Sequence, residues 1–156
     1  MKKDTRLYNV MFPIWFLLLF PSLWVVMLPV NFIADSLVIL LSAHHQGLED
    51  RKSLWKTSIL PVWLIGFLCD IAGAGLTVLL YYLQSELNFP FHNPILFPGT
   101  CLISLPGVIL AGVLIYFVNK RFSFKKSGLD AGAVRRLCLH LAIFTAPYTM
   151  LIPLYG

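Results

Sequence analysis

Two carboxylates, Asp35 and Asp70, lie inside long apolar stretches of the sequence. An ionisable side chain within a membrane span costs about 2.5–3.5 kcal/mol on insertion scales, so its presence needs a structural or functional reason. At such depth a carboxyl group binds a proton or a cation, or it forms hydrogen bonds between helices. Asp35 and Asp70 are therefore the residues whose types and positions point most directly to chemistry.

Helical spacing places further polar groups beside both carboxylates. Asn31 lies four residues before Asp35 and shares its face of a helix. Thr77 follows Asp70 on a stripe of small and polar residues, a type of face that packs against helices rather than lipid. This stripe consists of Gly66, Asp70, Gly73, Ala74 and Thr77. We predict a buried polar site formed by Asn31, Asp35, Asp70 and Thr77.

The two carboxylates are expected at nearly the same depth in the bilayer. Counted from the inner ends of their helices, Asp35 lies about 12 Å and Asp70 about 13.5 Å from the inner boundary. Two neighbouring carboxylates in a low dielectric cannot both ionise cheaply, so we expect at least one to be protonated near neutral pH. Two interpretations stay open: the pair holds helices together, or it forms a proton or cation site.

No catalytic set accompanies these residues. The sequence contains no HExxH, no GxSxG and no glycine-rich phosphate loop, and its expected spans hold a single histidine, His140. The cysteines, Cys69, Cys101 and Cys138, are far apart in the sequence and are expected to be free thiols. We therefore predict no catalytic residue, no metal ligand, no cofactor and no enzyme activity.

The elements that must position the carboxylates are membrane helices. Of the 156 residues, 58% are hydrophobic and 12% are charged, whereas soluble domains carry about 25% charged residues. The mean hydropathy is +0.80. This composition excludes a soluble enzyme, a disordered chain and a disulfide-stapled module. It predicts one all-α integral membrane domain over residues 1–156, with apolar segments at about 7–20, 23–43, 57–83, 100–118 and 137–154.

Basic residues predict the orientation of these segments. The N-terminus and residues 44–56 and 119–136 are basic, whereas residues 84–99 contain no Lys or Arg. The positive-inside rule then puts the N-terminus and both basic loops in the cytoplasm and residues 84–99 outside. The net charge of +5 is explained by these loops and not by binding to nucleic acid.

An even number of crossings must therefore lie between Arg6 and Arg51. Pro21 is the best position for a reversal, because proline ends one helix and suits the first turn of the next. Residues 7–20 then form either a short tilted helix or a re-entrant arm. The expected fold is an N-terminal Pro-turned helical hairpin or re-entrant segment plus three transmembrane helices, with the C-terminus outside.

Two surface features have ordinary and specialised interpretations. Gly107 and Ala111 have the small-xxx-small spacing of close helix packing, which we expect within the chain rather than between two copies. The last basic loop either sets the topology alone or also contacts anionic lipid headgroups. Its basic residues are Lys120, Arg121, Lys125, Lys126, Arg135 and Arg136.

Four stretches resemble small membrane proteins of Gram-positive bacteria that have no assigned activity. They are residues 6–15 (RLYNVMFPIW), 28–35 (LPVNFIAD), 66–70 (GFLCD) and 144–148 (FTAPY). The resemblance covers most of the chain. It implies a multi-pass protein of the bacterial plasma membrane and implies nothing about chemistry.

The sequence favours a non-enzymatic protein, an accessory or structural subunit of a membrane assembly. The alternative is a small proton- or cation-coupled transporter or channel that uses Asp35 and Asp70. The expected partners are the lipid bilayer and either another protein or further copies of this chain.

Overall fold

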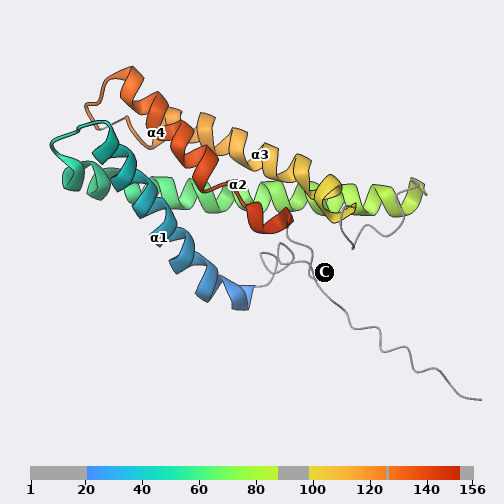
Figure 1. Ribbon diagram of the computed structural model, residues 1–156. Helices are drawn as coiled ribbons and strands as arrows, with labels where there is room; N and C mark the ends of the chain where they lie inside the picture. Colours follow the sequence, from blue (N-terminus) through green and yellow to red (C-terminus); the bar gives the residue numbers. More distant parts are fainter. Residues whose placement is uncertain (1–20, 88–98, 126, 152–156) are drawn as a thin grey trace, which may run out of the picture.

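The computed structural model describes residues 21–87, 99–125 and 127–151, and this part of the chain is helical without strands (Figure 1). The elements are α1 (Pro21–His45), α2 (Arg51–Leu87), α3 (Gly99–Phe122), α4 (Ala131–Phe144) and a short 3-10 helix, η2 (Tyr148–Leu151). The prediction of an all-α fold is confirmed. The predicted first segment, residues 7–20, and the reversal that precedes Pro21 lie outside the described residues.

Three helices are long and apolar enough to cross a membrane. Their apolar parts are Val25–His45, Arg51–Gln84 and Cys101–Phe122. Each begins or ends somewhat beyond the predicted segment, because a helix continues through charged residues at the membrane surface that a hydropathy criterion leaves out. Thus α2 begins at Arg51 rather than at residue 57, and α3 continues to Phe122 rather than to residue 118.

The predicted last span, residues 137–154, is wrong as a single helix. Within the described residues, α4 has 14 residues and ends at Phe144. At 1.5 Å per residue it is about 21 Å long, which is short of the roughly 30 Å hydrocarbon core. The physical reason is Pro147, which has no backbone N–H to continue the helix.

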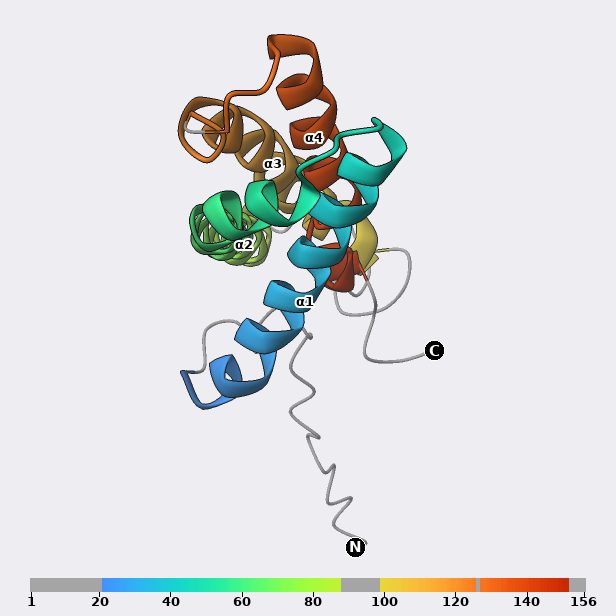
Figure 2. The ribbon, with the colours of Figure 1, turned by 90° about the vertical axis from the view of Figure 1, so that its left-hand side faces the viewer.

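The long helix α2 packs against α1 and α3, and α4 packs against the same two helices. Figure 1 shows α3 running along α2, with α4 above them and α1 crossing at an angle. Figure 2 shows the same crossing from the side, with the first turns of α1 leaning away from the other helices. The loop at 46–50 and residues 127–130 meet at one end of the bundle, where Leu48 and Leu129 line the same hollow. Both basic loops therefore lie at one end, as the sequence predicts.

Small residues allow α2 and α3 to approach closely. A Cβ atom built on Gly73 would lie 2.6 Å from the Gly107 carbonyl oxygen and 3.0 Å from the Ala111 Cβ. Side chains larger than hydrogen are therefore excluded at the crossing point. The expected packing of Gly107 and Ala111 within the chain is confirmed.

Gly73→Ala is expected to destabilise the bundle, whereas Gly75→Ala is not. The new methyl group at Gly73 must push against the Gly107 backbone, and overpacking of this kind costs about 1–3 kcal/mol. Gly75 is exposed and has no atom within 4 Å of the added Cβ, so alanine there only improves helix propensity. Thermal unfolding of the two variants in detergent measures the difference. Equal melting temperatures would contradict the close α2–α3 crossing.

Candidate functional site

A cavity of about 350 Å³ lies between the middle of α1, the middle of α2 and the segment that follows α4. Helices α1 and α2 contribute Asn31, Asp35 and Asp70, and the chain between Phe144 and Thr149, which includes polar side chains of its own, closes the third side. The remaining lining is largely apolar. The lining residues are Met27, Val30, Asn31, Ala34, Asp35, Gly66, Asp70, Phe144, Thr145, Ala146, Pro147, Tyr148 and Thr149.

Both predicted carboxylates line this cavity. Asp35 is 3% exposed and Asp70 is 6% exposed, so both side chains are withdrawn from the surface. The Asn31 Nδ2 donates a hydrogen bond to the Asp70 Oδ2 across the α1–α2 contact (3.3 Å). The structure therefore brings Asn31, Asp35 and Asp70 together, as the helical spacing predicts.

One carboxyl oxygen of the Asp35–Asp70 pair, the Asp70 Oδ1, is buried and has no hydrogen-bond partner among the described residues. A buried carboxylate oxygen without a hydrogen bond is costly, because it has lost water and gained nothing in exchange. The arrangement is therefore incomplete without a proton, a water molecule or a cation on that oxygen.

Asp35 has a different set of neighbours. A Cβ atom built on Gly66 would lie 3.5 Å from the Asp35 Oδ2, so the missing side chain at Gly66 leaves room for the carboxyl group. The Thr145 side chain, which follows α4, lines the same cavity and lies close enough to Asp35 to interact with it. Asp35 thus connects α1 to the broken end of the last helix.

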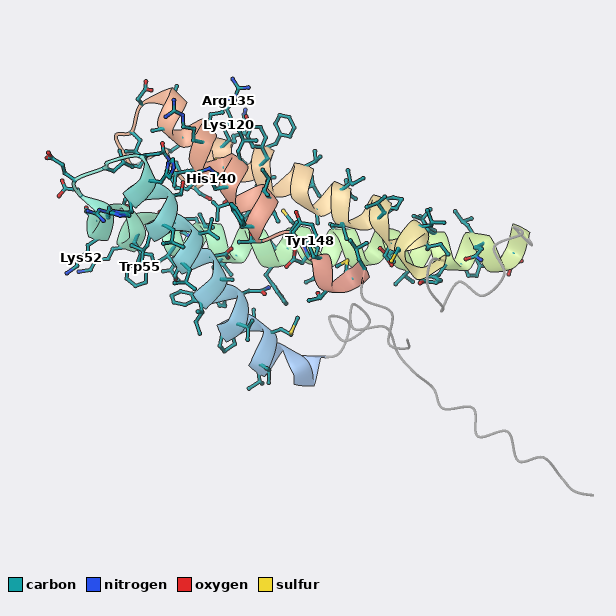
Figure 3. The ribbon with its side chains drawn as sticks, viewed as in Figure 1. Lys52, Trp55, Lys120, Arg135, His140 and Tyr148 are labelled. Carbon is teal, nitrogen blue, oxygen red and sulfur yellow. The ribbon has the colours of Figure 1, made fainter. Side chains whose placement is uncertain are left out.

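The break after α4 is built from hydrogen bonds that replace the missing helical ones. The Thr145 N–H and its hydroxyl both donate to the Leu141 carbonyl oxygen (2.9 Å and 2.8 Å). Pro147 cannot donate to the Ile143 carbonyl, and the Tyr148 hydroxyl donates to that oxygen instead (2.7 Å). Tyr148, labelled in Figure 3, lines the same cavity as Asp70. The break is therefore a stable feature that ends α4 next to the two carboxylates.

Thr77, the fourth predicted residue, lies apart from this site. It is fully buried, and its hydroxyl donates to the Gly73 carbonyl oxygen within α2 (3.0 Å). A Cβ built on Gly107 would collide with the Thr77 hydroxyl, so Thr77 packs against α3. It belongs to the α2–α3 crossing and not to the carboxylate cavity.

The sequence reasoning missed the contribution of residues 145–148. The available signal was Pro147 inside the expected last span, which marks a break in a helix. A second missed contact joins α1 to α4, where the Ser42 hydroxyl and the His140 Nδ1 are 2.6 Å apart. Gln46 donates a further hydrogen bond to the Ser42 hydroxyl (3.2 Å).

The predicted lipid-contacting residues lie near one end of the bundle. Lys52, Lys120 and Arg135 are labelled in Figure 3 toward the end that carries both basic loops. Lys126 lies outside the described residues. The others are exposed, as contact with headgroups requires: Lys120, Arg121, Lys125, Arg135 and Arg136.

Metal and disulfide chemistry find little support in the described residues. No three His, Cys, Asp or Glu side chains there are grouped so that they could hold a metal ion. Cys69, Cys101 and Cys138 are all free, as predicted.

No protein-family model, no curated protein and no solved structure matches the chain.

Proposed function

We propose that this chain is a small proton- or cation-coupled membrane transporter or channel whose binding site is the Asp35–Asp70 cavity. The observation that carries the proposal is the buried Asp70 Oδ1, which has no hydrogen-bond partner among the described residues and belongs to a carboxyl pair that lines a cavity. Buried carboxylates within membrane segments are typical of proton relays and ion pathways.

The charge of the cavity supports a positively charged ligand. Its lining contains two carboxyl groups and no Lys, Arg or His side chain. In a low dielectric, states in which charges cancel are strongly favoured. The pair therefore needs protons or a cation to remain buried, and either can be exchanged for the other.

The broken last helix supports the same function. Discontinuous helices near the middle of the bilayer form the ion sites of many transporters, because a helix C-terminus carries a partial negative charge and free carbonyl groups. Here α4 ends at Phe144, and the next residue, Thr145, lines the cavity beside Asp35. The end of α4 thus adds negative potential where the carboxyl pair lies.

The proposal includes a place and an orientation. The three apolar helices cross the bacterial plasma membrane, and the end with the basic loops faces the cytoplasm. The exposed basic residues there contact anionic headgroups. The chain acts with another membrane protein or with further copies of itself, because so few spans enclose little of a pathway.

An accessory or structural subunit is the second candidate function. The observation that favours it is the set of bonds between helices, since Asn31 joins α1 to α2 and the Ser42–His140 contact joins α1 to α4. In that case the carboxyl pair only fixes how the helices pack. Asp70→Asn would then be nearly silent, because asparagine keeps the size and hydrogen-bonding capacity of the side chain, and Asp70→Leu would destabilise the fold.

Proton movement in reconstituted vesicles separates the two functions. The protein is placed in vesicles that contain a pH-sensitive dye, and four driving forces are applied in turn: a membrane potential and gradients of Na⁺, K⁺ and benzyltrimethylammonium. We expect at least one to move protons through the wild-type protein and none to do so through Asp70→Asn. Glu49→Gln, which alters an exposed loop carboxylate, is expected to behave as wild type.

Two outcomes of this experiment would contradict the proposed function. Wild-type protein that moves no protons under any of the four driving forces would overturn the transport function. Equal proton movement by wild type and Asp70→Asn would show that the carboxyl pair is not on the pathway. Gel filtration and circular dichroism of each variant establish that it is folded, and Asp35→Asn replaces Asp70→Asn if the latter is not.

A further inference from the structure

The cavity is larger and more apolar than a proton or a small inorganic ion requires. Its volume is about 350 Å³, whereas one water molecule occupies roughly 30 Å³ of liquid. Its polar atoms come from only a few side chains, and apolar groups such as Met27, Val30 and Ala146 line the rest. A ligand that fills this space must combine a charged group with an apolar body.

Aromatic side chains stand at the outward-facing part of the cavity. Phe144 is 68% exposed and Tyr148 is 49% exposed, and Val30 beside them is 53% exposed. These faces resemble the other outward faces of the spans, which carry apolar side chains for contact with lipid. Aromatic rings bind organic ammonium ions through cation–π attraction. The opening therefore suits a ligand that arrives from the lipid and carries an ammonium group.

The buried part of the cavity selects the charge of that ligand. The Asp70 Oδ1 is without a hydrogen-bond partner among the described residues, and its side chain is 6% exposed and lines the cavity. Together with Asp35 it attracts a cation. No Lys, Arg or His lines the cavity, so the phosphate of a zwitterionic lipid headgroup would find no counter-charge there. The chemistry fits a cation without an attached anionic group.

We propose that the ligand of this cavity is a hydrophobic monovalent organic ammonium ion, which enters between α1 and α4 and exchanges with a proton of the Asp35–Asp70 pair. The inference rests on the proposed function and names its substrate class. In the empty site a proton on each carboxyl group leaves the charges balanced. The ammonium ion pairs with one carboxylate, and the proton of that carboxyl group passes to water, so one positive charge replaces another.

Calorimetric titration with benzyltrimethylammonium tests this exchange on the full chain in detergent. Titrations in two buffers of different ionisation enthalpy count the protons released. We expect saturable binding with release of one proton per cation, and an affinity that rises about tenfold per pH unit while one proton is displaced. Neopentylbenzene, the neutral carbon isostere, and phosphocholine, the zwitterionic headgroup, are expected not to compete.

Variants of the carboxyl pair, the exposed loop and the aromatic opening locate the binding. Asp70→Asn is expected to abolish saturable binding, with Asp35→Asn as the second variant if Asp70→Asn fails to fold. Glu49→Gln, in the exposed loop, is expected to bind as wild type does. Phe144→Leu removes one aromatic ring and keeps both carboxyl groups, so it should weaken binding about fivefold without changing the proton count.

Several outcomes would overturn the inference. They are equal heats for wild type and Asp70→Asn, equal competition by neopentylbenzene or phosphocholine, and binding without proton release. Proton movement driven by Na⁺ or K⁺ in vesicles, together with no binding of benzyltrimethylammonium, would remove the organic ligand and leave the proposed function standing. Vesicles that move no protons under any driving force would remove both.

Discussion

The infrared spectrum of the purified protein at neutral pH is expected to contain the carbonyl stretch of a protonated carboxyl group, and the double variant Asp35→Asn/Asp70→Asn is expected to lose it. Both side chains are buried and line a cavity that contains no Lys, Arg or His side chain to balance their charge. Two negative charges in such surroundings are much more costly than a protonated pair. The band therefore reports the proton that the proposed function requires.

The assignment of the band is clear because the other acidic side chains of the described residues are exposed. Glu49, Asp50, Glu86 and Asp130 all lie at the surface, outside the apolar cavity. Glu49→Gln should leave the band unchanged and serves as the matched control. A wild-type spectrum without the band, or a double variant that keeps it, would show that the pair does not hold a proton.

The position of the carboxyl pair could be predicted because it depends on few quantities. The rise per residue of a helix is constant, and the basic loops fix which helix ends lie together. Counting from those ends placed Asp35 and Asp70 close in depth, and the structure puts both at one cavity. The spacing of Asn31 and Asp35 by one helical turn likewise placed the amide on the correct face.

The same reasoning wrongly placed Thr77 in the polar site, because it used only the helical stripe on which Thr77 lies. A stripe on one helix face keeps its direction, but the helix that covers it changes along its length. Around Gly66 and Asp70 the neighbour of α2 is α1, whereas at Gly73 and Thr77 the neighbour is α3. The periodicity of one segment does not determine the angle at which neighbouring helices cross it. The sequence alone therefore could not show that α1 covers one part of the stripe and α3 covers the next.

The last predicted span failed for a related reason. Hydropathy continues through residues 137–154, and one proline within an apolar run is compatible with a kinked helix as well as with a broken one. The outcome is decided by whether other groups can satisfy the freed carbonyls. Here the Tyr148 hydroxyl bonds to the Ile143 carbonyl, and the Thr145 hydroxyl bonds to the Leu141 carbonyl. Such partners become visible only when the chain is folded.

Single cysteines at the two ends of α2 are expected to label from opposite sides of the membrane. In a background with Cys69, Cys101 and Cys138 replaced by alanine, Ser53→Cys is expected to react with a membrane-impermeant maleimide only after bacterial cells are permeabilised. Glu86→Cys is expected to react in intact cells. Both original residues are exposed, and they lie near the first and last turns of one helix.

The physical reason is the unequal charge at the two ends of the bundle. The end that contains Ser53 also carries Lys52, Lys120 and Arg135 (Figure 3). Short loops that are rich in Lys and Arg face the cytoplasm. Lys125→Cys, after α3, should behave as Ser53→Cys does, because both loops lie at that end. Labelling of Ser53→Cys but not Glu86→Cys in intact cells would reverse the orientation. Labelling of both from one side would show that α2 does not cross, and the Asp35–Asp70 cavity would then lie outside the low dielectric on which its chemistry depends.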